Sequence, residues 1–197
     1  MVAKSTAKPS ARERLLAAAD ELFYEEGVHT VGIDRVIEHA GVAKGSLYNT
    51  FGSKDELIRA YLSRRHEMYI ERITKAIDQH SSPRDRLLAV FDALGELRAR
   101  EGFRGCPFTR ASAEARPGDA AQQVSAEYRQ WVRGLFTELA AENGAADPVT
   151  LGWQLDLVYT GASVSARTDR SLAAVAMARG AAEVLLDAAL AAGPGRD

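Results

Sequence analysis

The apolar residues of this 197-residue chain recur at helical spacing, and no segment alternates like a β-strand. The first apolar run follows Ser10 and stops at Gly27, and Ser10 with Glu13 has the spacing of a capping box. Two short runs come next, at 33–40 and 44–50, with Gly41 between them. Further runs cover 53–79, 83–100, 124–139, 148–166 and 171–192, and Cys106-Pro107 opens another short one. The pattern predicts an all-α fold of about nine helices.

The composition is that of an ordinary globular protein, with 46% hydrophobic and 26% charged residues. No apolar run approaches the roughly 18–20 residues of a membrane span, and the polar start of the chain lacks the apolar segment of a secretory signal. The single cysteine, Cys106, excludes a framework of intramolecular disulfides. We therefore expect a cytoplasmic protein that does not use a membrane as its partner.

The two short helices around Gly41 have the form of a helix-turn-helix unit, whose second helix enters the DNA major groove. The residue types of that helix suit the task. A slim start at Gly45 allows close approach, Lys44 can meet a phosphate or a guanine, and Tyr48 can reach the backbone. The candidate DNA-binding residues of this stretch are Lys44, Gly45, Ser46, Tyr48, Asn49, Thr50 and Lys54. The alternative interpretation is a corner of a helical bundle with no nucleic-acid role.

The whole stretch AADELFYEEGVHTVGIDRVIEHAGVAKGSLYNTFGSKDEL, residues 18–57, resembles the tetracycline-repressor (TetR) family of bacterial transcriptional regulators. That family shares a helix ending in phenylalanine and glycine, an Ala-Gly-Val turn, a Lys-Gly-(Ser/Thr)-Leu-Tyr recognition helix and a following Ser-Lys-(Asp/Glu)-x-Leu. The matching residues are Phe23, Gly27, Ala40, Gly41, Val42, Lys44, Gly45, Ser46, Leu47, Tyr48, Phe51, Ser53, Lys54, Asp55 and Leu57. The resemblance covers about residues 11–60.

The residues themselves predict a flexible arm over 1–9 and a tail over 193–197. The resemblance implies a helix-turn-helix DNA-binding domain over 10–52 and a helical ligand-binding and dimerisation domain over 53–192. Its expected partners are an operator in double-stranded DNA, a small-molecule effector, and a second copy of the chain bound through the last two helices. The implied function is that of a repressor that a ligand releases from a near-palindromic operator. No cofactor and no metal are expected. The long helix 53–79 would connect ligand site and DNA.

Three positions depart from the family pattern. Gly32 and Ala43 stand where many members have a hydroxyl residue that caps the second helix and the recognition helix, respectively. Thr50 stands where many members have tyrosine or histidine. We expect these departures to change the preferred operator sequence rather than the mode of binding. Without a hydroxyl at position 32, we expect the phosphate contact either to be lost or to shift to the Val31 backbone or to Thr30, which is a further candidate DNA-binding residue.

The aromatic residues of the later helices could line an effector pocket, because such pockets are mostly apolar. Alternatively, they are core residues at helical spacing. Cys106 stands at an expected helix start, which favours a reactive thiolate, whereas free cysteines are also commonly buried as small apolar residues. The candidate ligand-binding residues are Phe91, Phe103, Cys106, Phe108, Tyr128, Trp131, Trp153 and Tyr159.

An enzyme is not expected. The four histidines all lie within the first 80 residues, and no glycine loop of a nucleotide-binding type occurs. Glu26 and His29 make one E-x-x-H spacing, but no second set completes a di-metal site.

Overall fold

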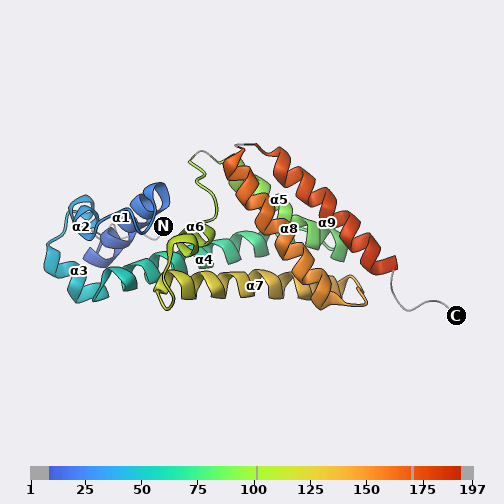
Figure 1. Ribbon diagram of the computed structural model, residues 1–197, viewed down its shortest axis with the longest axis horizontal. Helices are drawn as coiled ribbons and strands as arrows, with labels where there is room; N and C mark the ends of the chain where they lie inside the picture. Colours follow the sequence, from blue (N-terminus) through green and yellow to red (C-terminus); the bar gives the residue numbers. More distant parts are fainter. Residues whose placement is uncertain (1–8, 101, 170, 192–197) are drawn as a thin grey trace, which may run out of the picture. The chain divides into compact units, whose positions relative to one another are not determined.

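A computed structural model describes residues 9–100, 102–169 and 171–191, which form nine α-helices and no β-strand (Figure 1). The predicted all-α fold of about nine helices is confirmed over these residues. Apart from Pro9, the expected arm and tail lie outside them. The helices are α1 (Ala11–Glu26), α2 (Ile33–Ala40), α3 (Lys44–Phe51), α4 (Lys54–Ile77), α5 (Pro83–Ala99), α6 (Pro107–Glu114), α7 (Ala120–Glu142), α8 (Pro148–Thr168) and α9 (Ala173–Ala191).

Helix α1 begins at the capping box that the sequence predicts. The Ser10 hydroxyl accepts a hydrogen bond from the Glu13 amide at 3.2 Å, and the Ser10 amide donates to the Glu13 carboxylate at 2.7 Å. These two bonds satisfy two backbone N–H groups that would otherwise have no hydrogen-bond acceptor at the helix start. The helix ends at Gly27, whose positive φ of 101° is unfavourable for other residues.

The turn between α2 and α3 is built on Gly41, which has a left-handed conformation with φ 60° and ψ 43°. Its amide donates to the Glu38 carbonyl at 3.0 Å, and the Val42 amide donates to the Ile37 carbonyl at 3.3 Å. Arg14 of α1 donates to the Gly41 carbonyl at 2.9 Å and so ties α1 to this turn. The turn therefore has a fixed geometry, and α3 starts in a defined direction.

The chain divides into two compact units. The first contains α1–α3, α4 up to Arg65, and Pro107–Ser125; the second contains His66–Cys106 and the chain from Ala126 onward. Helices α4 and α7 thus contribute residues to both units. This division by contacts differs from the functional boundary at 52/53, which stays a prediction.

The first unit has a buried aromatic pair and a bidentate ion pair beside it. Phe23 of α1 meets Tyr61 of α4 edge to face, with ring centroids 5.6 Å apart. Arg65 of α4 binds both carboxylate oxygens of Asp20 at 2.6 and 2.8 Å, and its guanidinium lies 4.2 Å from the Tyr24 ring centroid. Bidentate, partly buried contacts of this kind have a fixed geometry, so they hold α1 against α4.

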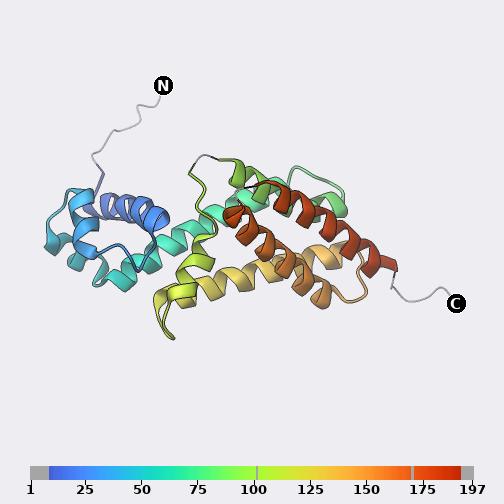
Figure 2. The same cartoon turned by 45° about the horizontal axis from the view of Figure 1, so that its top comes forward.

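The second unit has an aromatic core between α5, α7 and α8. Phe91, Phe136 and Tyr159 are all buried, with ring centroids between 5.6 and 5.9 Å apart. Helices α8 and α9 run side by side in both views (Figures 1 and 2). Buried Ala162 and Ala182 allow their close approach.

Gly152 permits the contact between α7 and α8, and we expect Gly152→Ala to destabilise the second unit. A Cβ at this position would lie 2.9 Å from the Thr137 amide nitrogen and 3.0 Å from its Cα, and backbone atoms cannot move aside cheaply. Overpacking of this kind costs about 1–3 kcal/mol of unfolding free energy. Urea unfolding followed by circular dichroism at fixed protein concentration measures the loss.

Gly134→Ala is the matched control, because no atom lies within 4 Å of a Cβ there and the residue is exposed on α7. Its helix propensity should raise stability by up to about 1 kcal/mol. Equal stability of the two variants would contradict the close approach at Gly152.

Candidate functional site

Helix α3 has one fully buried side chain and a polar exposed side. Leu47 is buried against the rest of the first unit, and Phe51 is half-buried beneath the Arg12 guanidinium at 5.7 Å. Tyr48, Asn49 and Thr50 are exposed. The helix is therefore anchored by its apolar residues while its hydrogen-bonding residues remain available to a partner.

The start of α3 is slim and lacks a capping side chain. Ala43 occupies the N-cap and makes no side-chain hydrogen bond there, as its departure from the family pattern predicts. No atom lies within 4 Å of a Cβ built on Gly45. Uncapped amides at a helix start carry partial positive charge and suit a phosphate. Gly32, at the N-cap of α2, likewise provides no side-chain cap.

Lys44 is paired in the isolated protein with Asp34 of α2. Its Nζ lies 2.8 Å from Asp34 Oδ1, and both side chains are largely exposed. The hydrogen bond to Asp34 raises the pKa of Lys44, so the ammonium stays charged. Sequence reasoning missed this partner, because Asp34 and Lys44 lie in different helices. If Lys44 contacts DNA as the sequence predicts, Asp34 would compete with the phosphate for it.

We expect Asp34→Asn to increase DNA affinity severalfold, because it frees Lys44 and removes a negative charge beside α3. The slope of log affinity against log salt should steepen by about one unit, as for one added phosphate contact. Fluorescence anisotropy with a labelled duplex at several salt concentrations measures both quantities. Glu38→Gln removes the same charge from an exposed position on α2 and should leave the slope unchanged. An unchanged slope in Asp34→Asn would contradict the competition.

Thr50 and Ser46 are linked within α3. The Thr50 hydroxyl donates to the Ser46 carbonyl at 2.6 Å. To donate to a phosphate or base, Thr50 must break this bond, whereas exposed Asn49 has no such constraint among the described contacts. Thr50 is thus less prepared for readout than its neighbour.

The other two candidate DNA contacts lie outside α3. Thr30 is exposed in the turn between α1 and α2. Lys54 is half-buried at the first position of α4, and burial lowers its pKa. It lines an open hollow of about 590 Å³ together with His29, Asp55 and Arg116.

The candidate ligand residues gather only in part. Tyr159 lies between Phe91, whose ring centroid is 5.9 Å away, and Tyr128, with which it shares a hydrogen bond. Phe91, Tyr128 and Tyr159 are buried in the second unit, whereas Phe108 is buried in the first. Trp153 is 47% exposed on α8, with the Arg133 guanidinium 3.1 Å from its ring centroid. Their assignment to a ligand site stays a prediction.

Three further candidates are half-buried in the second unit. The Phe103 ring lies 5.4 Å below the Arg98 guanidinium, and Trp131 packs against Tyr128 with centroids 6.3 Å apart. Cys106 directly precedes α6. Burial raises the pKa of Tyr128 well above its ordinary value, and Tyr159 and Cys106 add to that rise. The Tyr128 phenol therefore stays neutral.

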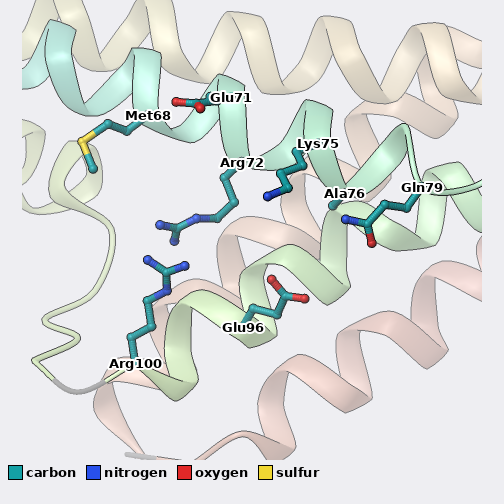
Figure 3. Close-up of a pocket in the computed structure, with 8 residues that line it drawn as sticks. All are labelled: Met68, Glu71, Arg72, Lys75, Ala76, Gln79, Glu96 and Arg100. Carbon is teal, nitrogen blue, oxygen red and sulfur yellow. The ribbon is translucent and has the colours of Figure 1, made fainter. Parts of the chain in front are cut away.

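A cavity of about 340 Å³ lies between α4 and α5 in the second unit (Figure 3). None of the eight candidate ligand residues lines it. Its position is visible in sequence only as a polar face of α4 at helical spacing, which is also the pattern of an ordinary solvated face. The lining residues are Met68, Glu71, Arg72, Lys75, Ala76, Gln79, Glu96 and Arg100.

Comparison with known proteins agrees with this geometry. The family of bacterial regulatory proteins called tetR matches residues 15–61. The chain is similar to a TetR-family transcriptional regulator from Streptomyces coelicolor with a known crystal structure, at 32% identity and a TM-score of 0.86, over 91% of this chain and 95% of that one.

Two curated relatives have functional names. The HTH-type transcriptional repressor NemR of Escherichia coli strain K12 is 28% identical over 172 residues, which are 81% of this chain and 85% of NemR. The HTH-type transcriptional activator FasR of Mycolicibacterium smegmatis is 38% identical over 82 residues, 42% of this chain and 37% of FasR.

The helix-turn-helix in the first unit, the all-α fold and these relatives together define a transcriptional regulator that binds DNA, not an enzyme. The chain belongs to the TetR family. No described helix is both long enough and apolar enough to cross a membrane.

Proposed function

We propose that this protein is a homodimeric, ligand-responsive regulator that binds a near-palindromic operator through α3. The observation that carries the proposal is the structure of α3, whose only fully buried side chain is Leu47 while Tyr48, Asn49 and Thr50 are exposed. A recognition helix needs both features to approach base edges.

A homodimer through α8 and α9 is supported by the apolar side chains that these helices expose. On α8, Trp153, Leu157 and Val164 recur at helical spacing and are between 45% and 66% exposed. On α9, Met177 is 71% and Val184 67% exposed. A face of this composition is typical of a protein–protein interface.

Small residues on the same helices serve both packing within the chain and approach of a partner. Ala162, Ala166 and Ala182 are buried within the chain. Gly161 and Gly180 are exposed, and no atom lies within 4 Å of a Cβ built on either. A partner backbone could therefore come close at the two glycines. The dimer would be two-fold symmetric, which explains the near-palindromic operator.

Effector binding in the second unit would act on DNA binding through α4, which has residues in both units. A ligand that prefers one orientation of α4 changes the population of DNA-binding states. Such coupling is typically about 1–3 kcal/mol and reciprocal. Operator DNA should therefore lower the affinity for the effector by the same factor by which the effector lowers the affinity for the operator.

Repression is the proposed sign of regulation. The relative named a repressor, NemR, aligns over 81% of this chain, whereas the one named an activator, FasR, aligns over 42%. The longer alignment includes the unit that carries regulation, so it is the better guide.

Operator selection from a random duplex library, followed by footprinting, tests the proposal. The expected result is two inverted half-sites whose centres lie about 34–36 Å apart or a multiple of one helical turn, bound by an even number of chains. A folded dimer that gives no sequence-specific footprint at low salt would refute it.

A further inference from the structure

The cavity between α4 and α5 contains two arginines that face each other. Arg72 of α4 and Arg100 at the end of α5 point their guanidinium groups toward one another (Figure 3). Neither side chain forms an ion pair or a hydrogen bond with any described residue. Nη1 of Arg72 is buried and has no hydrogen-bond partner. A buried donor of this kind costs free energy unless something binds it.

The two guanidinium charges also act on each other. Burial lowers the pKa of Arg72, and the charge of Arg100 lowers it further. The opposing influences of Tyr69 and Glu96 are weaker than that of Arg100. The space between the two guanidinium groups therefore favours an anion.

The charge and size of the cavity select the kind of anion. Three cationic and two acidic side chains line it, which leaves one net positive charge. Most of these charged side chains are exposed to water, and we expect a singly charged carboxylate to match the lining better than a doubly charged phosphate. The volume of about 340 Å³ is at the low end of the range of ligand pockets, so the ligand is small. Paired guanidinium groups bind a carboxylate with strong, directional hydrogen bonds.

The remainder of the lining indicates a second polar group on the ligand. Lys75, Gln79 and Glu96 lie to one side of the arginine pair, and the Met68 thioether lies to the other (Figure 3). Their amine, amide and carboxylate groups can bind a hydroxyl or an amine. These three side chains are exposed, so a polar group on the ligand would replace water as their partner.

We propose that this cavity binds a small, polar organic monocarboxylate, with its carboxylate held between Arg72 and Arg100. That such an acid is also the effector rests on the function proposed above. The site differs from the aromatic set that the sequence predicts, because it depends on charge rather than on apolar surface.

Matched acids and amides test the binding. The full chain, without DNA, is titrated with acetate, lactate, glycinate, benzoate and 4-hydroxybenzoate, each beside its amide, in thermal-shift and calorimetric experiments at constant ionic strength. At least one polar acid should raise the melting temperature and bind, while its amide does not, since the amide lacks the charge. Inorganic phosphate should bind more weakly than that acid.

Substitutions locate the site. Arg72→Gln and Arg100→Gln should each lower the affinity for the acid about 10- to 100-fold, as expected for the loss of a charge-assisted hydrogen bond. Arg64→Gln removes the same charge from an exposed position on α4 outside the cavity and should bind as wild type. Without ligand, Arg100→Gln should melt at the wild-type temperature or above, because it relieves repulsion. A clear drop would indicate a structural role and overturn the proposal.

Other outcomes would also overturn it: no acid binding beyond its amide, tighter binding of phosphate, or wild-type affinity in both arginine variants. Operator binding is measured separately, with and without the acid. An acid that binds at Arg72 and Arg100 but leaves operator affinity unchanged would support the site and refute its role as effector. Failure to bind any operator would refute the proposed function and leave the acid site standing.

Discussion

Replacement of Leu157 by glutamate is expected to convert the proposed dimer into monomers and to abolish operator binding without unfolding the chain. Leu157 is 66% exposed on α8, between Trp153 and Val164 on the same apolar face. In a single chain, a glutamate there would lie in water and cost little. In a two-fold dimer the change appears twice, and carboxylates forced into an interface from which water is excluded cost several kcal/mol.

The affinity for the operator should fall when the dimer dissociates, because a monomer has one recognition helix and reaches only one half-site. Analytical ultracentrifugation measures the association state, circular dichroism the fold, and fluorescence anisotropy the affinity for the selected operator. Gln130→Glu adds the same charge at an exposed position of α7 and should remain dimeric. A Leu157→Glu protein that is still a tight dimer would show that another surface mediates association.

Local signals along the chain predict the helices well. The Ser10–Glu13 box, Gly27 and Gly41 set the ends of α1 and α2, and the structure contains these features with the expected bonds. Helix 33–40 has the predicted bounds. The reason is physical: helix caps and glycines with positive φ depend on residues within five positions of each other. The same holds for the missing caps at Gly32 and Ala43.

Contacts between helices are not predictable in this way. The pairing of Lys44 with Asp34 and the bond from Arg14 to the Gly41 carbonyl depend on how α1, α2 and α3 meet. The facing of Arg72 and Arg100 likewise joins residues of two helices. In sequence each of these charges is compatible with an ordinary exposed side chain.

Aromatic residues at helical spacing show the same limit. Tyr159 and Trp153 both lie on α8 and have the same apolar signal in sequence. Tyr159 is 5% exposed and Trp153 47% exposed. Which one belongs to the core depends on the face of α8 that α5 and α7 cover, and that face is set by tertiary packing. Candidate pocket residues chosen by aromatic character therefore include core and surface positions alike.

Gly45→Leu is expected to leave the protein folded and dimeric but to weaken operator binding by at least about 100-fold. No atom lies within 4 Å of a Cβ built on Gly45, and the residue is exposed, so we expect the free protein to accommodate the larger side chain. The helix even gains intrinsic propensity from the change. On DNA, the leucine would occupy the space between the start of α3 and the base edges. It would prevent several base contacts at once, each worth about 1–3 kcal/mol.

The separation of stability from affinity makes this test specific. Urea unfolding should show wild-type or higher stability, while anisotropy shows the weaker binding to the selected operator. Gly134→Leu introduces the same side chain at another open helical glycine, on α7, and should bind DNA as wild type. The graded variant Gly45→Ala should lose less affinity than Gly45→Leu, because the obstruction grows with side-chain size. Wild-type operator affinity in Gly45→Leu would mean that the start of α3 does not approach DNA, and the recognition surface would have to be sought elsewhere in the first unit.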